Sequence, residues 1–390
     1  MINTSMGTLL LRKTKPIFVI IMSFCTVRGL IFLWRAMMKL NKFTVSFEEQ
    51  DMRFLKKYGP LQANYMVFKH YKKYDMPFIN DTYQLAGCLC MPRKEIFKMS
   101  KNAEKFYKQI ELPKKNGGVR KINAPNAYLK KAQKQILNKI LSNAKISPFA
   151  TAYIKGKNLK DNASPHTNHK YLLKMDITDF FGSITYLQVI SSAFNSNIYP
   201  VQIGAILTSM CCLNDALPQG APTSPMLSNI VMKNFDDIIG NWCKERNIAY
   251  TRYCDDLTFS ADAPLYNVYV KVKDMLEKRG FEINQSKTKF ITNASSQMVT
   301  GLTVNEKVSI PSDYKRSLRQ EVYFVLKFGL QDAILKGKRH NFIKNDKLRI
   351  TNYYNHLKGK INYVLQIESQ NNWFVEALKR LDVIFFEEFM

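Results

Sequence analysis

Two segments that carry aspartates constrain the fold of this chain more than any other feature. KYLLKMDITDFF contains an apolar run typical of a buried strand, and Asp176 stands at the end of that strand. IAYTRYCDDLTFSA is typical of a strand, a tight turn and a second strand, with Asp255 and Asp256 at the turn. If these strands are neighbours, three carboxylates meet at one place. Without cations between them they would repel one another and raise each other's pKa.

Magnesium suits such a place because it prefers hard carboxylate oxygens and keeps several of its waters. Two divalent ions about 3.5–4 Å apart can activate an attacking hydroxyl and stabilise a triphosphate leaving group, which is the chemistry of nucleotide transfer. A pair of adjacent aspartates alone is weak support, because most such pairs lie in surface turns. We therefore expect a Mg²⁺ cofactor, bound as two ions, with Mn²⁺ as a substitute.

The charge of the chain indicates its partners. Lys and Arg number 58 and Asp and Glu 31, a formal net charge of +27. Such a field attracts polyanions, with nucleic acid as the first expectation and an anionic membrane surface as the second. Aromatic residues make up 12% of the chain, which argues against a disordered basic tail and allows base stacking beside phosphate contacts.

The seven cysteines form no C-x-x-C pair, and the five histidines are scattered along the chain. Because the number of cysteines is also odd, the sequence favours neither a disulfide framework nor a zinc site. A reducing, cytoplasmic location fits this cysteine usage best.

The first 40 residues form a hydrophobic and basic extension of unknown role. Residues 16–38 are mostly apolar, but Arg28 and Arg35 leave runs too short for a membrane span of about 20 residues. No small-residue cleavage site of a signal peptide is evident. We expect a helix packed on the body, or sequence upstream of a true start near Met37 or Met38, and a membrane anchor remains the alternative.

The order of the remaining predicted elements is mixed α/β. Short helices are expected over 41–99, followed by two extended runs around Asn116–Gly118, which is a strong hairpin signal. The apolar spacing over 129–140 predicts a helix. A second hairpin is expected in MVTGLTVNEKVSIP, and the chain then turns helical to its end.

Three segments resemble, in the expected order, the motifs of the reverse transcriptase family. MDITDFF matches the first palm motif, LPQGAPTSPMLSN the glycine-rich motif and YCDD the signature box. The resemblance covers roughly residues 100–305. It implies an RNA-directed DNA polymerase (a nucleotidyltransferase) with an α/β (α+β) right-hand fold. Residues 41–305 would form the fingers and a palm with an antiparallel sheet, and 306–390 a helical, basic thumb that binds RNA or duplex.

The resemblance assigns the catalytic roles by position. Asp176 and Asp255 correspond to metal ligands and Asp256 to a supporting carboxylate, while the backbone carbonyl of Ile177 would join the coordination shell.

The resemblance also assigns residues that contact the incoming nucleotide. Phe181 stands where the family places the ring that excludes a ribose 2′-OH, and Phe180 would be a core residue. Gln219 and Gly220 match the loop beneath the template base and incoming nucleotide, where glycine allows the backbone to approach closely.

Four basic residues match positions that contact phosphates in the family. Arg120 and Lys121, on the return arm of the first hairpin, are placed like the triphosphate clamp, with solvated hairpin charges as the alternative. Lys287 or Lys289 would protonate the leaving pyrophosphate, and the sequence does not choose between them.

Two further segments resemble retron reverse transcriptases. Asn162 to His166 match an N-A-x-x-H segment, and Val299-Thr300-Gly301 match a V-T-G element after the palm. The resemblance implies dNTP substrates, a structured noncoding RNA used as primer and template, and a branched RNA–DNA product (msDNA). It also implies an effector protein and antiphage defence. We expect the RNA to be anchored chiefly by residues 299–301 and the thumb helices beyond Pro311, with His166 in a supporting role and Asn162 as a further RNA contact.

The predicted thumb has an excess of Lys and Arg over Asp between residues 331 and 360, including Lys336, Lys338 and Arg339. Interleaved tyrosines favour a nucleic-acid groove, and a solvated surface is the alternative. Other bacterial reverse transcriptases, of the group II intron, diversity-generating or abortive-infection kind, remain alternatives to a retron enzyme. A catalytically silent RNA-binding scaffold is a further alternative, although the three intact aspartates argue against it.

Overall fold

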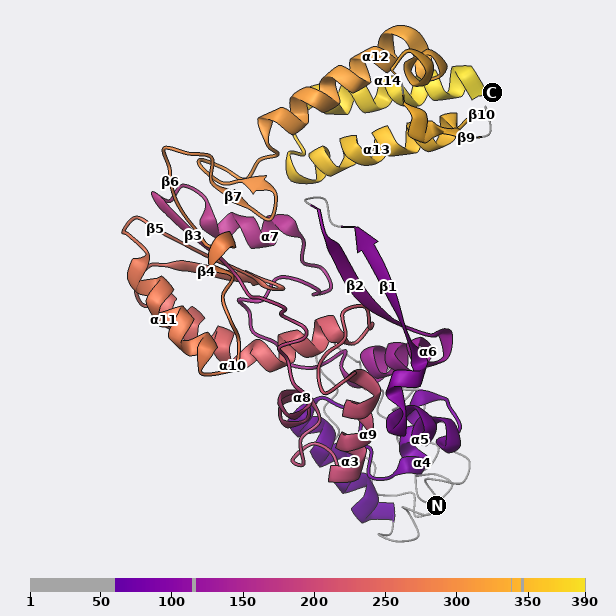
Figure 1. Ribbon diagram of the computed structural model, residues 1–390, viewed down its shortest axis with the longest axis vertical. Helices are drawn as coiled ribbons and strands as arrows, with labels where there is room; N and C mark the ends of the chain where they lie inside the picture. Colours follow the sequence, from indigo (N-terminus) through magenta and orange to yellow (C-terminus); the bar gives the residue numbers. More distant parts are fainter. Residues whose placement is uncertain (1–59, 114–116, 338, 345–346, 390) are drawn as a thin grey trace, which may run out of the picture.

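The computed structural model describes residues 60–389, except 114–116, 338 and 345–346, and the molecule is long and curved (Figure 1). Helices of the fingers lie at one end, the palm sheet lies in the middle and a helical thumb forms the other end. The N-terminal extension 1–40 and its apolar stretch 16–38 lie outside the described residues. Within the described part of the chain, no helix has the length and apolar character needed to cross a membrane.

The fingers are helical apart from one hairpin. They comprise α3 (Pro60–Tyr74), α4 (Thr82–Leu89), α5 (Arg93–Lys101), the 3₁₀ turn η1 (Ala103–Phe106), β1 (Tyr107–Pro113), β2 (Val119–Pro125), α6 (Ala127–Gln135), the π-helical turn η2 (Ile136–Ile140), α8 (Tyr186–Ala193) and α9 (Val201–Cys211). Asp81 begins α4 by accepting hydrogen bonds from the N–H groups of Tyr83 and Gln84. The predicted hairpin and the predicted helix after it are both present, and the apolar face of that helix is buried.

The palm is a four-stranded antiparallel sheet in the order β4-β5-β3-β6. Its elements are α7 (Leu159–Ala163), η3 (Ser164–His166), β3 (Tyr171–Asp176), α10 (Ser224–Lys244), β4 (Ala249–Tyr253), β5 (Asp256–Ala261), α11 (Tyr266–Glu277), η4 (Gln285–Lys287) and β6 (Lys289–Thr292). Because strand residues alternate between faces, Leu173 and Met175 enter the large core that includes residues of α10 and α11. Leu172 points to the opposite face and joins a second core.

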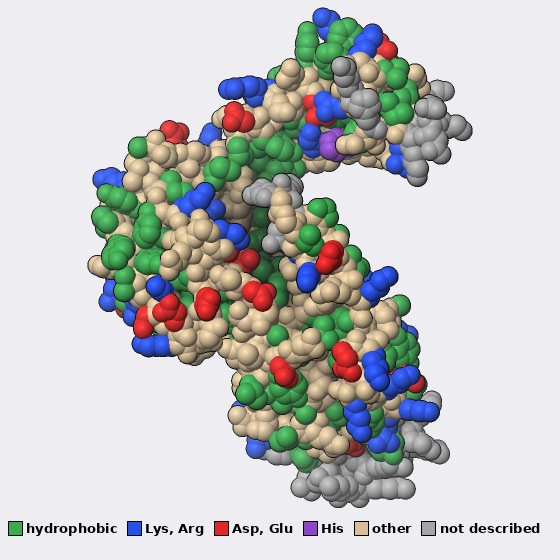
Figure 2. Space-filling view, in the orientation of Figure 1, with side chains coloured by type: hydrophobic (Ala, Val, Ile, Leu, Met, Phe, Trp, Pro, Cys, Tyr) green, Lys and Arg blue, Asp and Glu red, His purple; other side chains and the backbone are tan. Residues whose placement is uncertain are grey.

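The thumb contains three long helices, a 3₁₀ turn and a small hairpin, namely α12 (Ser312–Lys336), η5 (His340–Phe342), β9 (Ile343–Lys344), β10 (Lys347–Leu348), α13 (Ile350–Ile367) and α14 (Asn372–Phe389). A second small hairpin, β7 (Met298–Val299) and β8 (Leu302–Thr303), precedes it in the chain. The predicted β7–β8 hairpin is present, and its Val299 and Leu302 belong to the same core as the thumb helices. The β9–β10 hairpin was not predicted. The space-filling view shows a wide hollow between the thumb and the fingers hairpin (Figure 2).

Candidate active site

The sheet brings the predicted carboxylates together. Asp176, the last residue of β3, lies directly opposite Asp256, the first residue of β5, so both side chains share one face. The N–H of Ile177 donates to the carbonyl of Asp255 at 3.1 Å, which ties the end of β3 to the turn between β4 and β5. The predicted neighbourhood of the two aspartate segments is therefore confirmed.

A lysine lies against these carboxylates. Lys287 Nζ is 2.9 Å from Oδ1 and 3.0 Å from Oδ2 of Asp176. The bond to Asp176 raises the pKa of Lys287. Lys289 lies instead on β6, opposite Lys174 and two residues back along the sheet. Of the two lysines that sequence left open, Lys287 is the one that the fold places at the carboxylates.

The charges at the site favour a bound cation. Burial, followed by the nearby Asp255 and Asp176 carboxylates, raises the pKa of Asp256, while Lys174 opposes this shift. Among the described residues, no group of three or more His, Cys, Asp or Glu side chains is already arranged as a metal cage. Mg²⁺ needs no such cage, because it typically binds one or two carboxylates together with waters and substrate phosphates. The ammonium of Lys287 on Asp176 shows that this carboxylate accepts a positively charged partner.

A buried ion pair stabilises the turn that carries Asp255. Cys254 has a left-handed φ of 61°, and its carbonyl accepts a 2.9 Å hydrogen bond from Arg252 Nη1. Arg252 also pairs with Asp236 of α10 at 2.6 Å, with both side chains fully buried. Arg252 Nη2 donates to Asn229, the last residue of the glycine-rich motif, at 3.1 Å. This network joins two of the motifs, and sequence reasoning missed it. The available signals were an arginine in an apolar strand and an aspartate inside an amphipathic helix.

The two phenylalanines after Asp176 differ in burial. Phe180 is 3% exposed and packs near Phe281, with ring centroids 6.1 Å apart, so it is a core residue as expected. Phe181 is half-buried and packs against the same core. Only Phe181 therefore keeps exposed surface that could contact a nucleotide.

The glycine-rich loop packs on the fingers hairpin. The N–H of Asn123 donates to the carbonyl of Gln219 at 2.8 Å. Gly220 has a φ of 126°, and a Cβ there would lie 2.7 Å from Ile122 Cγ2 and 2.8 Å from the Asn123 carbonyl. Glycine is thus required for close approach to β2, a reason that differs from the expected approach to a ligand.

The same contact orients the predicted triphosphate clamp. Because Ile122 of β2 faces the glycine-rich loop, Arg120, two residues earlier on that strand, points to the same side. Lys121 points to the opposite side. Both residues are exposed, and the geometry favours Arg120 over Lys121 as a contact for substrate phosphates.

Three of the predicted RNA-binding residues are buried and cannot touch RNA in this structure. His166 is fully buried, and its ring nitrogens lie 2.8 Å from Ser260 Oγ and 2.8 Å from Thr251 Oγ1. Asn162 is also fully buried and contacts Thr151, and Val299 is part of the thumb core. The expected RNA contacts at Asn162, His166 and Val299 are therefore wrong, because these side chains bond or pack inside the protein.

The tip of the β7–β8 hairpin is accessible. Thr300 is half-buried and Gly301 exposed, and Thr300 Oγ1 accepts a 3.3 Å hydrogen bond from Asn162 Nδ2. Asn162 thus connects the palm to the hairpin, and Thr300 and Gly301 remain the residues of this set that could meet RNA.

The basic residues predicted to bind RNA in the thumb differ in exposure and in their ion-pair partners. Lys336 is exposed and pairs with Asp332 at 2.6 Å, whereas Lys338 lies outside the described residues. Arg339 pairs at 3.0 Å with Glu321, whose side chain is only 4% exposed and which also pairs with Lys360. The expected role of Arg339 as a free RNA contact is therefore corrected to an ion pair that joins α12 to the loop after it.

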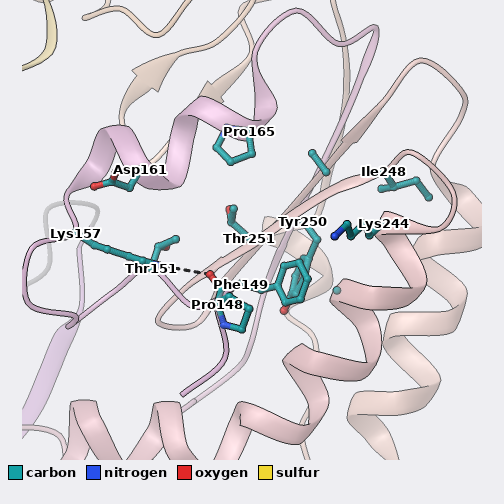
Figure 3. A pocket seen from close by; sticks show the side chains of 12 residues that line it. Pro148, Phe149, Thr151, Lys157, Asp161, Pro165, Lys244, Ile248, Tyr250 and Thr251 are labelled. Atoms are coloured by element: carbon teal, nitrogen blue, oxygen red, sulfur yellow. Dashed lines mark hydrogen bonds between the residues drawn. The ribbon is translucent and has the colours of Figure 1, made fainter. Parts of the chain in front are cut away.

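A pocket of about 310 Å³ lies away from the carboxylates, between α7, the end of α10 and β4 (Figure 3). Lys157 lines this pocket, and its Nζ donates to the carbonyls of Pro148 at 3.1 Å and Ala150 at 3.0 Å. No predicted catalytic residue lines this pocket.

Known proteins match this chain over most of the described region. The model of the reverse transcriptase (RNA-dependent DNA polymerase) family matches residues 112–312. The retron Ec83 reverse transcriptase of Escherichia coli is 33% identical over 70% of this chain and 86% of its own length. The retron Ec86 reverse transcriptase of Escherichia coli is 28% identical over 80% and 92%. The retron Mx65 reverse transcriptase of Myxococcus xanthus is 32% identical over 55% of each protein, so the chain spans about half of that relative. With its motifs, sheet register and relatives in agreement, the chain belongs to the reverse transcriptase family, among the retron enzymes.

Proposed function

We propose that this protein extends a priming strand on its own structured noncoding RNA and produces a branched RNA–DNA molecule (msDNA). The observation that carries the proposal is the pairing of Asp176 with Asp256 in the sheet, with Asp255 in the adjoining turn. The similarity to retron reverse transcriptases supports RNA as both primer and template. An effector protein, a role in antiphage defence and a cytoplasmic location belong to the same proposal.

Enzymes of this family generally use divalent metal ions. We assign Asp176, Asp255 and the carbonyl of Ile177 to two Mg²⁺ ions, with Asp256 in support and Mn²⁺ as a substitute. When bound, these ions lower the pKa of the attacking hydroxyl and stabilise charge on the triphosphate. Lys287 would give a proton to the leaving pyrophosphate, and its contact with Asp176 supports this role.

The protein's own groups would orient the substrates. Arg120 offers bidentate donors to the triphosphate, which suits a guanidinium better than an ammonium. Phe181 would stand over the sugar of the incoming nucleotide, and the loop at Gln219 and Gly220 would support the template base. The exposed tip at Thr300 and Gly301, with the thumb helices, would hold the RNA in one register.

The polymerase part of the proposal is tested with Asp255→Asn and Asp176→Asn. Loss of a charged ligand should abolish DNA synthesis on a primed RNA while leaving thermal unfolding and RNA binding nearly unchanged. Asp256→Asn should be less severe. Asp274→Asn is the control, because Asp274 is exposed on α11 and lies on the other side of the sheet. Robust extension by the Asp255→Asn protein would reject the assignment and leave an RNA-binding scaffold as the function.

The product is tested separately. Short DNA recovered from cells is treated with RNase and then with debranching enzyme, and its mobility is compared on a denaturing gel. A shift on debranching supports a 2′,5′ branch at an internal guanosine of the RNA. DNA primed from an ordinary 3′ end would reject branched priming without touching the polymerase assignment. Replacing Thr300 and Gly301 should impair synthesis on the cognate RNA more than extension of a generic annealed primer.

A further inference from the structure

Two lysines face each other in the palm sheet beside the carboxylates. Lys174 of β3 lies directly opposite Lys289 of β6. In such antiparallel pairs the Cβ atoms are about 5 Å apart, and two like charges at this distance destabilise the sheet. Within the described part of the chain, neither lysine side chain forms a hydrogen bond or a close ion pair, although the charge of Lys174 acts on the nearby Asp256. The pair therefore concentrates positive charge that no protein group contacts directly.

Both side chains point to the face that carries the catalytic aspartates. On β3, Met175 enters the palm core, so Lys174 and Asp176 lie on the opposite face. On β6, Phe290 packs against Tyr269 of α11 with ring centroids 5.8 Å apart, so Lys289 points away from α11. Lys174 is half-buried and Lys289 is exposed, so a ligand in the hollow can reach them.

The pair lies between the carboxylates and the thumb. Two residues before Lys174, Leu172 belongs to the core that also contains the β7–β8 hairpin and the thumb helices, with Ile291 beside it. Because a step of two residues along a strand is about 7 Å, the lysines lie one row behind the aspartates in the direction of the thumb. A nucleic-acid strand with its reacting end at the aspartates and its body on the thumb must cross this row.

We propose that Lys174 and Lys289 jointly bind one backbone phosphate of the priming strand, just behind its reacting end. Two ammonium groups on neighbouring strands can donate to different oxygens of the same phosphodiester, and this contact removes their mutual repulsion. The inference rests on the proposed function and moves Lys289 from the leaving pyrophosphate to the priming strand.

The test uses a DNA primer annealed to an RNA template, with a neutral methylphosphonate at the first, second or third linkage from the 3′ end. The wild-type protein should lose roughly ten-fold in affinity at one linkage only. The Lys174→Gln/Lys289→Gln protein should bind the unmodified primer roughly ten-fold more weakly and should be insensitive to the methylphosphonate at that linkage. The slope of log affinity against log salt should fall by about one, since one phosphate contact is lost.

The matched control is Lys273→Gln/Lys278→Gln, which removes the same charge from α11 and the residue after it, on the other side of the sheet. It should keep the wild-type methylphosphonate pattern. If the methylphosphonate lowers the primer affinity of the Lys174→Gln/Lys289→Gln protein as much as that of the wild-type protein, the inference is wrong. A raised KM for dNTP with unchanged primer affinity would also overturn it and place the pair at the triphosphate. Failure of the wild-type protein to incorporate any dNTP would reject the proposed function, while the binding comparison would still decide the phosphate contact.

Discussion

The buried guanidinium of Arg252 donates a 2.9 Å hydrogen bond to the carbonyl of Cys254, the residue that precedes Asp255. Cys254 adopts a left-handed backbone conformation that costs free energy for a side chain other than glycine. The bond from Arg252 stabilises this conformation, and Asp236 keeps Arg252 charged inside the protein. The geometry of the aspartate turn therefore depends on an ion pair that never meets substrate.

Removing one partner of this pair should be more damaging than removing both. Arg252→Leu should lower the free energy of unfolding by about 3–5 kcal/mol, because it leaves Asp236 charged and buried. Arg252→Leu/Asp236→Leu should recover much of that stability but little DNA synthesis, because the Cys254 carbonyl still lacks its donor. Urea unfolding and primer extension measure the two effects. Full activity in the double variant would show that the turn does not need the pair.

Lys287 and Lys289 should affect different steps. Lys287→Gln should slow single-turnover incorporation by roughly 10²–10⁴-fold at saturating primer, as expected for loss of a general acid. Lys289→Gln should act mainly on primer affinity. Rapid-quench measurements with primer and dNTP in excess separate the two outcomes. A normal rate in Lys287→Gln would mean that its contact with Asp176 exists only in the absence of substrate.

Phe181 should control the choice of sugar. Phe181→Val should admit ribonucleotides while deoxynucleotide use falls modestly, because a smaller side chain no longer excludes the 2′-OH. The measured quantity is the ratio of kcat/KM for dNTP and rNTP. Phe180→Val is the comparison and should lower stability by about 3 kcal/mol, since its ring is buried in the core. If the choice between dNTP and rNTP changes in Phe180→Val but not in Phe181→Val, Phe180 is the residue that excludes the 2′-OH.

His166 should make stability depend on pH. Burial, followed by the nearby charge of His169, lowers the pKa of His166 to about 3, below the usual value of 6.5. Between these values the unfolded chain binds a proton that the folded chain does not, so this contribution to stability is present above pH 6.5 and is lost as pH falls. The slope for this one group is at most about 1.4 kcal/mol per pH unit. His166→Gln should flatten the stability curve from pH 6.5 to pH 4 in urea unfolding. Parallel curves for the two proteins would contradict the burial of a neutral imidazole.

Substitution of Lys336 should affect mainly RNA binding, whereas substitution of Arg339 should affect mainly the stability of the thumb. Lys336→Glu should weaken RNA binding and lower the salt slope by about one, while stability changes little because its surface pair with Asp332 is weak. Arg339→Glu should destabilise the thumb by about 1–3 kcal/mol, because a second carboxylate would face the buried Glu321, which keeps only Lys360 as its cationic partner. Anisotropy titrations at several salt concentrations, with thermal unfolding, measure both. If the salt dependence of RNA binding is unchanged in Lys336→Glu, this surface is solvated and does not contact RNA.

Most helices and strands could be predicted from the sequence alone, and so could the choice of Asp176, Asp255 and Asp256 as candidate metal ligands. Alternating apolar residues and the Asn-Gly-Gly turn predicted the strands and hairpins, because strand period and turn conformation depend on neighbouring residues. That Asp176 would meet Asp256 was expected only if their strands were neighbours, and the register of the sheet supplied that condition. The strands and turns themselves could be predicted because they depend on residues close together in the chain.

Only the tertiary structure decided which side chains are exposed and which partners they have. The Lys287 ammonium meets a carboxylate 111 residues earlier in the chain, and no local pattern distinguishes it from Lys289. His166 and Asn162 match a family segment, yet α7, η3 and the sheet enclose them. The Arg252–Asp236 pair and the facing Lys174 and Lys289 arise from helix packing and strand register. Burial and charge pairing depend on tertiary packing, so the amino-acid sequence alone could not reveal them.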